Sequence, residues 1–288
     1  SEKISFYSSI IFSLFPLYLY SCGQISSITL QVFLTILFFY YVLQITKNSN
    51  FYLIFFISLT SGLLMLLRGE FILLLSITFF YLFFYFKIKI KNILLMALII
   101  LLTISPYLIR NIIVVDKIVI TKSFGYNLWK GNNPNSTVEG GLLIDSNLKA
   151  KIDKISKDKS YGINFDKIFL DKAIENIINE PSRYLILFIK KFISFIFIDI
   201  NSSQKDYFRP LHYIPCILVG ITSTLGIILS HKKSRQLNYL ILMYFLNILI
   251  FACFFILPRY KLVILPIQLI LTNILLKHIL DKFVKKNE

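Results

Sequence analysis

The sequence predicts an all-α integral membrane protein with about eight transmembrane helices, an extracytoplasmic loop and an interfacial amphipathic helix. Hydrophobic residues make up 56% of the 288 residues and charged residues only 16%, whereas soluble domains carry roughly 25% charged residues. The apolar residues gather in runs that approach the roughly 20 residues that a membrane-spanning helix needs. The basic residues stand in short clusters between these runs, which is typical of membrane proteins.

The same composition excludes several other classes of protein. A disordered chain requires low hydrophobicity, and the mean hydropathy here is +0.71. The formal net charge of +16 does not indicate nucleic-acid binding, because the lysines lie between apolar runs and not along one basic stripe. The cysteines Cys22, Cys216 and Cys253 are too few and too scattered for a disulfide framework. No cofactor is expected; a divalent metal is compatible with the sequence, but no motif indicates one.

Eight apolar runs are candidates for membrane spans. The fourth run is short, and the snorkelling side chains of the lysines that follow it are expected to extend its reach. The predicted spans are Ile4–Cys22, Ile25–Gln44, Phe51–Leu67, Phe71–Phe86, Asn92–Ile109, Leu211–Ser230, Leu237–Leu257 and Leu262–Leu280. They divide the chain into a five-span part over residues 1–109, a loop part over 110–210, and a three-span part with a tail over 211–288.

A further apolar segment, Tyr184–Ile200, is expected to lie in the membrane interface and not to cross it. Lys190 and Lys191 stand at its centre, and each charged side chain costs roughly 2.5–3.5 kcal/mol at the middle of a span. Helical spacing places both lysines on one stripe with Arg183 and Ser194. Such a stripe is typical of a helix that lies on the membrane surface.

The loop part is predicted to be folded. Apolar residues recur at helical spacing over Phe165–Glu180, so this segment is expected to form a helix. Asn164 is the expected N-cap of this helix. Pro181 is expected to end it and to begin the next one.

The basic clusters predict the orientation of the chain. Lysine and arginine near span ends mark the cytoplasmic side. With eight spans, the clusters at Lys47, Lys87–Lys91, Lys232–Arg235 and the C-terminal tail all fall on one side. The protein is therefore expected in the cytoplasmic (inner) membrane, with both termini cytoplasmic and the long loop from Arg110 to Arg183 extracytoplasmic.

Ionisable side chains are almost absent within the predicted spans, whereas ion-coupled carriers and proton pumps need them near the midplane. Charged residues gather instead at the outward ends, namely Arg68 with Glu70, Arg110, and Arg259 with Lys261. Several cations at one membrane surface beside a folded loop suit a phosphate group at headgroup depth. Snorkelling of each arginine at a helix end is the alternative interpretation.

Two segments carry a resemblance to a known family. Residues 105–111 read Ser-Pro-Tyr-Leu-Ile-Arg-Asn, and residues 125–134 read Gly-Tyr-Asn-Leu-Trp-Lys-Gly-Asn-Asn-Pro. They resemble segments of bacterial membrane glycosyltransferases of the GT-C superfamily, in the group related to protein mannosyltransferases and to the aminoarabinose transferase of lipid A. Residues 67–70, 180–184 and 258–266 are similar to further segments of this family, so the resemblance covers essentially the whole chain.

The resemblance implies inverting transfer of a sugar from a polyprenyl-phosphate donor to an extracytoplasmic acceptor. A carboxylate base takes the proton of the acceptor hydroxyl, and cations stabilise the departing phosphate. In this family the catalytic aspartate lies in a first outer loop, which would precede Ser1, so the chain is expected to be the C-terminal part of such an enzyme. Gln24 follows Gly23 where the family usually carries an acidic residue.

Candidate site residues follow from the resemblance and from the charged span ends. Glu70 is the candidate catalytic residue, and an ion pair with Arg68 is its alternative role. Arg110 and Arg259 are expected to approach each other and to hold the phosphate. The full set of candidate phosphate and sugar contacts is Arg68, Arg110, Asn127, Trp129, Asn132, Asn133, Arg259, Tyr260 and Lys261. The Asn-Asn-Pro sequence with the preceding glycine reads equally as a turn.

Two other functions remain open from the sequence. The chain is compatible with a lipid or sugar carrier, such as a flippase subunit without enzymatic activity, and with a non-catalytic membrane subunit that packs against a partner. Neutral broken helices in paired halves would favour the carrier. The expected partners are membrane lipid and a polyprenyl-phosphate-sugar donor, and no nucleic acid.

Overall fold

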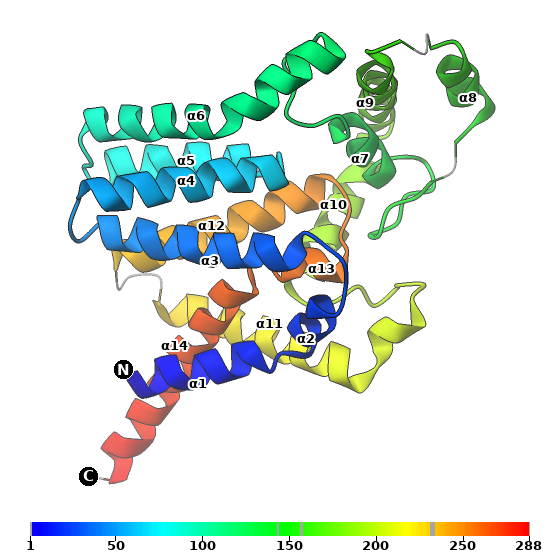
Figure 1. The fold of residues 1–288 in the computed structure, drawn as a ribbon. Coiled ribbons are helices and arrows are strands. Elements are labelled where there is room, and N and C mark those ends of the chain that lie inside the picture. The colour runs from blue at the N-terminus through cyan, green and yellow to red at the C-terminus, as the bar shows by residue number, and fades with distance from the viewer. Residues whose placement is uncertain (1, 143, 156–157, 231–233, 288) are drawn as a thin grey trace. The chain divides into compact units, whose positions relative to one another are not determined.

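The computed structural model describes residues 2–142, 144–155, 158–230 and 234–287, and every regular element in these ranges is a helix (Figure 1). The all-α prediction is therefore confirmed for the described chain. Within it, four helices are long and apolar enough to cross a membrane. They are α3 (Ile28–Ile45), α6 (Ile90–Val115), α11 (Pro210–Ser230) and α12 (Arg235–Cys253).

Three shorter apolar helices accompany these four in the described chain. They are α4 (Phe51–Leu67), α5 (Phe71–Phe84) and the first part of α14 (Leu265–Asn287). Helix α4 has the bounds that the sequence predicts. The total of eight spans stays a prediction. Of the basic cluster at residues 232–235, Lys232 and Lys233 lie outside the described residues.

The helices form two compact units that interleave along the chain. Unit 1 comprises Ser1–Ile36, Ile193–Ile248 and Leu257–Glu288, and unit 2 comprises Leu37–Phe192 and Leu249–Ile256. The long loop and its helices therefore belong to unit 2 up to Phe192.

Unit 1 is built around the pair of α11 and α14, with α1 (Glu2–Ser13) also packed on α14. The two long helices approach closely at Gly226, where a Cβ would lie 2.0 Å from the carbonyl oxygen of Leu271. The hydroxyls of Thr222 and Thr272 lie 2.9 Å apart in the same pair. Small and hydroxyl-bearing residues at the contact are typical of helix pairs in membranes.

The first predicted span is divided into two helices. Helix α1 ends at Ser13, and α2 (Pro16–Cys22) begins three residues later. Phe15 has an extended backbone with ψ of 125°, because the ring of Pro16 disfavours the helical conformation of the residue before it. One continuous helix over Ile4–Cys22, which the prediction of a single span implied, is therefore wrong.

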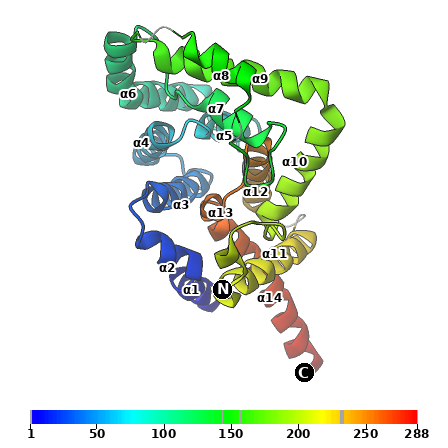
Figure 2. The same cartoon turned by 90° about the vertical axis from the view of Figure 1, so that its right-hand side faces the viewer.

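Unit 2 contains a layer in which α4, α5 and α6 lie side by side, as Figure 1 and the view in Figure 2 both show. Helices α4 and α6 run parallel, since Ser49 before α4 accepts a hydrogen bond of 3.1 Å from Asn92 near the start of α6. Further along the pair, a Cβ on Gly62 would lie 2.7 Å from Cβ of Thr103. Helix α5 runs in the opposite direction and connects the end of α4 to the start of α6 along the chain.

Helix α6 continues beyond its predicted end at Ile109 and stops at Val115. Pro106 lies inside it and cannot donate to the carbonyl of Leu102. The hydroxyl of Ser105 donates to that carbonyl instead, at 2.9 Å, which is how membrane helices accommodate a proline. The helix ends where Asp116 adopts the left-handed conformation, with φ of 56°. Arg110 therefore lies within a helix, and the start of the extracytoplasmic loop at Arg110 stays a prediction.

The loop folds into two short and two longer helices that follow α6 along the chain (Figure 1). They are α7 (Phe124–Gly131), α8 (Ser146–Asp153), α9 (Tyr161–Asn179) and α10 (Pro181–Ile196). The helix predicted over Phe165–Glu180 is present as α9, and Pro181 begins α10 as predicted. Asn164 is not the N-cap, because α9 begins at Tyr161. Two more short helices, η1 (Lys205–Phe208) and α13 (Pro258–Lys261), belong to unit 1.

Replacing Gly62 with leucine is expected to destabilise unit 2 by about 1–3 kcal/mol, because the new side chain would overlap Thr103 in a packed helix contact. Thermal unfolding in detergent micelles measures the effect. The control is Leu63→Phe, which adds volume at a position that is 37% exposed on the same helix. Equal shifts of the unfolding temperature in the two variants would contradict the close contact.

Candidate functional site

The parallel pair of α4 and α6 places two arginines at the same end. Asn92 follows its partner Ser49 by 43 residues, and Thr103 follows Gly62 by 41. Arg68 directly follows α4 and Arg110 lies in the last two turns of α6, so both lie beyond the contact of Gly62 with Thr103. We call this end, with Arg68, Glu70 and Arg110, the arginine end.

The turn between α4 and α5 brings a carboxylate to the arginine end. Nη1 of Arg68 lies 3.7 Å from Oε1 of Glu70, and the two side chains are 26% and 22% exposed. This is the ion pair that the sequence offered as the alternative role of Glu70. The same oxygen of Glu70 is buried and accepts no hydrogen bond from the described residues.

Arg110 is exposed on α6 and is oriented by its neighbour. Its Nη1 donates to Oδ1 of Asn111 at 2.9 Å, and the buried Asn111 donates in turn to the carbonyl of Val119 at 2.7 Å. The second bond ties the segment after α6 back to the helix. The same segment reaches the arginine end, since a Cβ on Gly69 would lie 3.3 Å from Cγ2 of Thr121.

Charge is separated along the α4–α6 layer. Helices α4 and α5 contain no charged residue between their ends. Lys47 precedes α4, and Lys87 and Lys89 separate α5 from α6, so these lysines lie at the end opposite to Arg68. The two arginines and one carboxylate leave the arginine end with a net positive charge.

Trp129 is part of a small aromatic core in the loop and is only 2% exposed. Its ring packs edge-on against Phe169 at 4.7 Å between centroids, and Tyr126 and Phe165 pack against the same cluster. Asp166 of α9 holds the start of α7, because its carboxylate accepts from the backbone N–H of Gly125 at 2.9 Å and of Tyr126 at 2.8 Å. Asn127 lies partly exposed on α7.

Asn132 and Asn133 hold the turn after α7 with their side-chain amides. Asn133 donates to the carbonyl of Gly141 at 2.9 Å, and its Oδ1 accepts from the N–H of Asn135 at 2.9 Å. Asn132 donates to the carbonyls of Leu128 and Cys253, each at 2.8 Å. Both side chains are buried. In the structure both side chains therefore stabilise the turn, and contact with a sugar stays a prediction.

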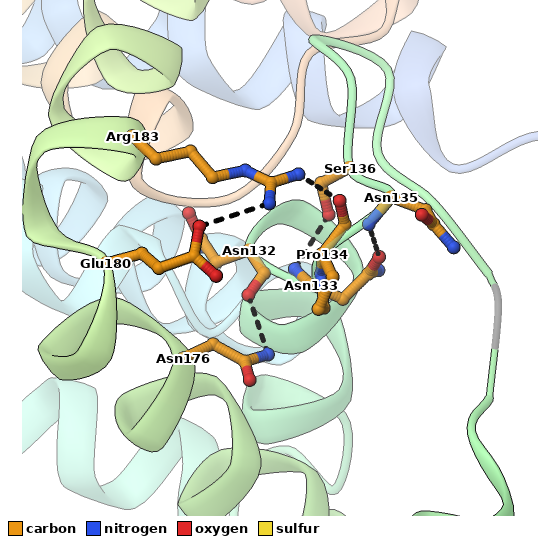
Figure 3. Close-up of polar contacts among 8 residues, drawn as sticks. All are labelled: Asn132, Asn133, Pro134, Asn135, Ser136, Asn176, Glu180 and Arg183. Carbon is orange, nitrogen blue, oxygen red and sulfur yellow. Dashed lines mark hydrogen bonds and ion pairs between the residues drawn. The ribbon is translucent and has the colours of Figure 1, made fainter.

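Two side chains from α9 and α10 dock on this turn, as Figure 3 shows. Asn176 donates to the carbonyl of Asn132 at 3.2 Å, and Arg183 donates to the carbonyl of Pro134. Arg183 also pairs with Glu180 at 3.3 Å. The helix pair at Pro181 is thereby fixed to the end of α7.

Lys191 completes this arrangement, and its role differs from the expectation. Its side chain is 0% exposed, and Nζ donates to the carbonyl of Gly131 at 2.7 Å and to Oδ1 of Asn132 at 3.3 Å. Lys190 is exposed, so the expected polar stripe that contains both lysines is wrong for Lys191. Burial lowers the pKa of Lys191 to about 7, and the nearby Cys253 opposes this shift.

Lys191 was missed as a site residue, although its spacing carried a signal. Tyr184 and Leu187 precede it by seven and four residues, and both are buried. These positions form the buried face of α10, and helical spacing places Lys191 on this apolar face and not on the polar one. The ammonium group of Lys191 contacts the carbonyl of Gly131, the last residue of α7. Carbonyls without an intrahelical partner at a helix C-terminus favour a positive charge.

The remaining candidate residues lie on α13 in unit 1. Arg259 is exposed, with its guanidinium 5.6 Å from the ring centroid of Tyr260. Lys261 is 4% exposed and donates to the carbonyl of Phe197. Burial lowers the pKa of Lys261 to about 8. Arg110 belongs to unit 2, so a phosphate shared by Arg110 and Arg259 stays a prediction.

Comparison with protein families, with curated proteins and with solved structures gives no match. Among the described residues, no group of three or more histidine, cysteine, aspartate or glutamate side chains is placed to hold a metal ion.

Because the pKa of Lys191 lies below its ordinary value of 10.5, the unfolded chain binds more protons than the folded chain between about pH 7 and 10.5. Stability is therefore expected to rise with pH across this window and to be lowest below about pH 7. Thermal unfolding in micelles at pH 6.5 and pH 9 measures this dependence.

Lys191→Met is expected to flatten the pH dependence because it removes the titrating amine. The matched control, Lys190→Met, removes an exposed amine one residue away and should leave the dependence intact. The interpretation fails if both variants flatten the dependence equally, or if neither does.

Proposed function

We propose that this protein is a membrane glycosyltransferase that transfers a sugar from a polyprenyl-phosphate donor to an extracytoplasmic acceptor. The observation that carries the proposal is the arginine end, where Arg68 and Arg110 lie at the same end of the pair of α4 and α6, and the helices α4 and α5 carry no charged residue. Segments 67–70, 105–111 and 125–134, which resemble the GT-C superfamily, all belong to unit 2. The first two of them contain the arginines of this end.

The chemistry requires stabilisation of the phosphate that departs from the sugar. A guanidinium offers a planar pair of donors to two phosphate oxygens, and an ammonium group does not. In the proposed reaction Arg110 holds the phosphate, with Arg68 as a further cation. Donors placed where negative charge develops stabilise the transition state, and they do so most strongly where water is excluded.

The reaction also requires a base that takes the proton from the acceptor hydroxyl. Glu70 is the carboxylate at the arginine end, and its Oε1 accepts no hydrogen bond from the described residues. A phosphate bound at Arg68 would compete for the cation that now pairs with Glu70. We infer that donor binding loosens this pair and leaves the carboxylate free to accept a proton.

The membrane placement is part of the proposal. In it, the chain crosses the cytoplasmic (inner) membrane eight times, with both termini cytoplasmic and the loop with α7, α8 and α9 extracytoplasmic. The separation of lysines from the arginine end supports this orientation, because basic clusters mark the cytoplasmic side. Helix α4 has 17 residues, or about 25 Å at 1.5 Å per residue, and a modest mismatch to the hydrocarbon core is tolerated.

Cysteine labelling tests this topology. After Cys22, Cys216 and Cys253 are replaced with serine, a cysteine placed at Asn147 should react with a membrane-impermeant maleimide added to intact cells. A cysteine placed at Ser234 should react only after the membrane is permeabilised. Both positions are exposed, so access to the reagent depends on the side of the membrane. The reverse pattern would overturn the orientation.

Replacing Arg110 with lysine is expected to weaken donor binding about tenfold although the charge is kept, because one of two charge-assisted hydrogen bonds is lost. Binding is measured with a photoreactive polyprenyl phosphate in phosphatidylcholine nanodiscs. The control is Lys117→Gln, which removes an exposed cation beyond the end of α6. Sugar transfer from the polyprenyl-phosphate donor is measured in the same nanodiscs.

Two outcomes would contradict the proposal. Unchanged labelling of the Arg110→Lys variant would remove Arg110 from the site. Equal competition by polyprenol, which lacks the phosphate, would show that only the hydrocarbon chain is recognised, as in a carrier without a phosphate site.

A further inference from the structure

A polar cluster lies buried among the helices of unit 1. Its four residues come from three helices and are at most 3% exposed, namely Ser223 on α11, Tyr244 and Asn247 on α12, and Gln268 on α14. Nε2 of Gln268 donates to the hydroxyl of Tyr244 at 3.1 Å, and Tyr244 is also hydrogen-bonded to Ser223. Asn247 follows Tyr244 by three residues and therefore lies on the same face of α12.

Two acceptor oxygens of this cluster are left without a donor. Oε1 of Gln268 and Oδ1 of Asn247 are buried, and neither accepts a hydrogen bond from the described residues. An unsatisfied buried acceptor is destabilising, so native proteins pair nearly all such oxygens with protein groups or with ordered water. Two of them on neighbouring helices therefore indicate a bound ligand that donates hydrogen bonds.

The surrounding bonds fix the orientation of the Gln268 amide. Its Nε2 also donates to the carbonyl of Ile196 at 3.4 Å, so exchanging the amide oxygen and nitrogen would bring two acceptors together there. The hydroxyl of Ser223 donates to the carbonyl of Gly220 at 3.1 Å, and its oxygen is then the acceptor for the proton of Tyr244. Neither rearrangement of the cluster therefore gives Oε1 a donor.

The surroundings select a small neutral molecule as the ligand. The ligand has to be small, because the residues of the cluster are at most 3% exposed. A cation is disfavoured, because the buried ammonium of Lys261 donates to the carbonyl of Phe197, next to Ile196, and like charges repel strongly in a low-dielectric interior. An anion would face two acceptor oxygens. Water is small and neutral, and it offers two O–H donors.

We propose that unit 1 contains a buried water-binding site at this cluster, in which a water molecule donates to Oε1 of Gln268 and to Oδ1 of Asn247. The water completes the hydrogen bonds of an amide that joins α14 to α12 and to Ile196, the last residue of α10. Ordered water satisfies polar groups between membrane helices in this way. The site does not depend on the proposed function, whose arginine end belongs to unit 2.

X-ray radiolysis of the full chain in phosphatidylcholine nanodiscs tests the site. Radiolysis converts a bound water into a hydroxyl radical, which oxidises the side chain beside it even where bulk solvent has no access. Mass spectrometry should find Tyr244 oxidised severalfold more than Tyr239, which is equally buried on the same helix. Equal oxidation of the two tyrosines would overturn the proposal.

A matched pair of variants tests the role of the orphaned oxygen. Asn247→Leu removes one acceptor and is expected to lower oxidation of Tyr244 about tenfold, because the water loses one hydrogen bond. Asn238→Leu makes the same substitution at an exposed position of α12 and should leave the oxidation unchanged. Equal oxidation of Tyr244 in the two variants would place the water away from Asn247 and would contradict the site.

Thermal unfolding in the same nanodiscs gives a second readout, whose sign distinguishes a hydrated oxygen from an empty contact. With water bound, Asn247→Leu is expected to lower the unfolding temperature by about 2–4 °C, because a hydrogen bond is lost. An oxygen without any donor would give the opposite result, since leucine would then remove an unsatisfied acceptor. If Na⁺ or K⁺ in place of choline raised the unfolding temperature, and Asn247→Leu abolished this rise, the ligand would be a cation and the water site would be wrong.

Discussion

The close contact of Gly62 with Thr103 is the constraint on which the arrangement of unit 2 depends. A residue with a side chain would separate α4 from α6, because its Cβ would lie 2.7 Å from that of Thr103. Glycine lets the two backbones approach, and the contact fixes which residues of the two helices are level. The parallel pairing then places Arg68 and Arg110 at the same end of the two helices, although neither residue takes part in the contact. The charges at the end are thus positioned by packing that lies in the uncharged middle of the layer.

The loop is held by polar side chains that donate hydrogen bonds to backbone carbonyls, because these carbonyls have no backbone donor. The turn after α7 leaves carbonyls that no helix satisfies, and unsatisfied backbone groups are costly when buried. Lys191 donates to the carbonyl of Gly131, Asn176 to that of Asn132, and Asn133 to that of Gly141. Gly131 allows this close packing, since a Cβ there would lie 1.8 Å from the carbonyl oxygen of Phe254. Burial of the ammonium group away from water is what lowers the pKa of Lys191.

Much of the fold was accessible from the sequence where one local signal decides the element. Helix α4 has its predicted bounds, and Pro181 separates α9 from α10 as expected. Helix α7 was missed because its start depends on Asp166, about forty residues away, which accepts the N–H groups of Gly125 and Tyr126. Pro16 indicates a helix break before it, but the length of the apolar run favoured the prediction of a single span. For the site, the sequence shows which residue types lie at the span ends. That Arg68 and Arg110 lie at the same end follows only from the pairing of two helices.

The structure separates two kinds of residue that the family resemblance groups together. Trp129, Asn132 and Asn133 are buried and bonded within unit 2, so the segment over 125–134 carries the information to fold the loop. Arg110 is exposed and Arg68 and Glu70 are partly exposed, and a ligand can reach them without unfolding anything. The chemistry depends on the second set, where the net charge is positive and a carboxylate oxygen lacks a hydrogen-bond donor among the described residues.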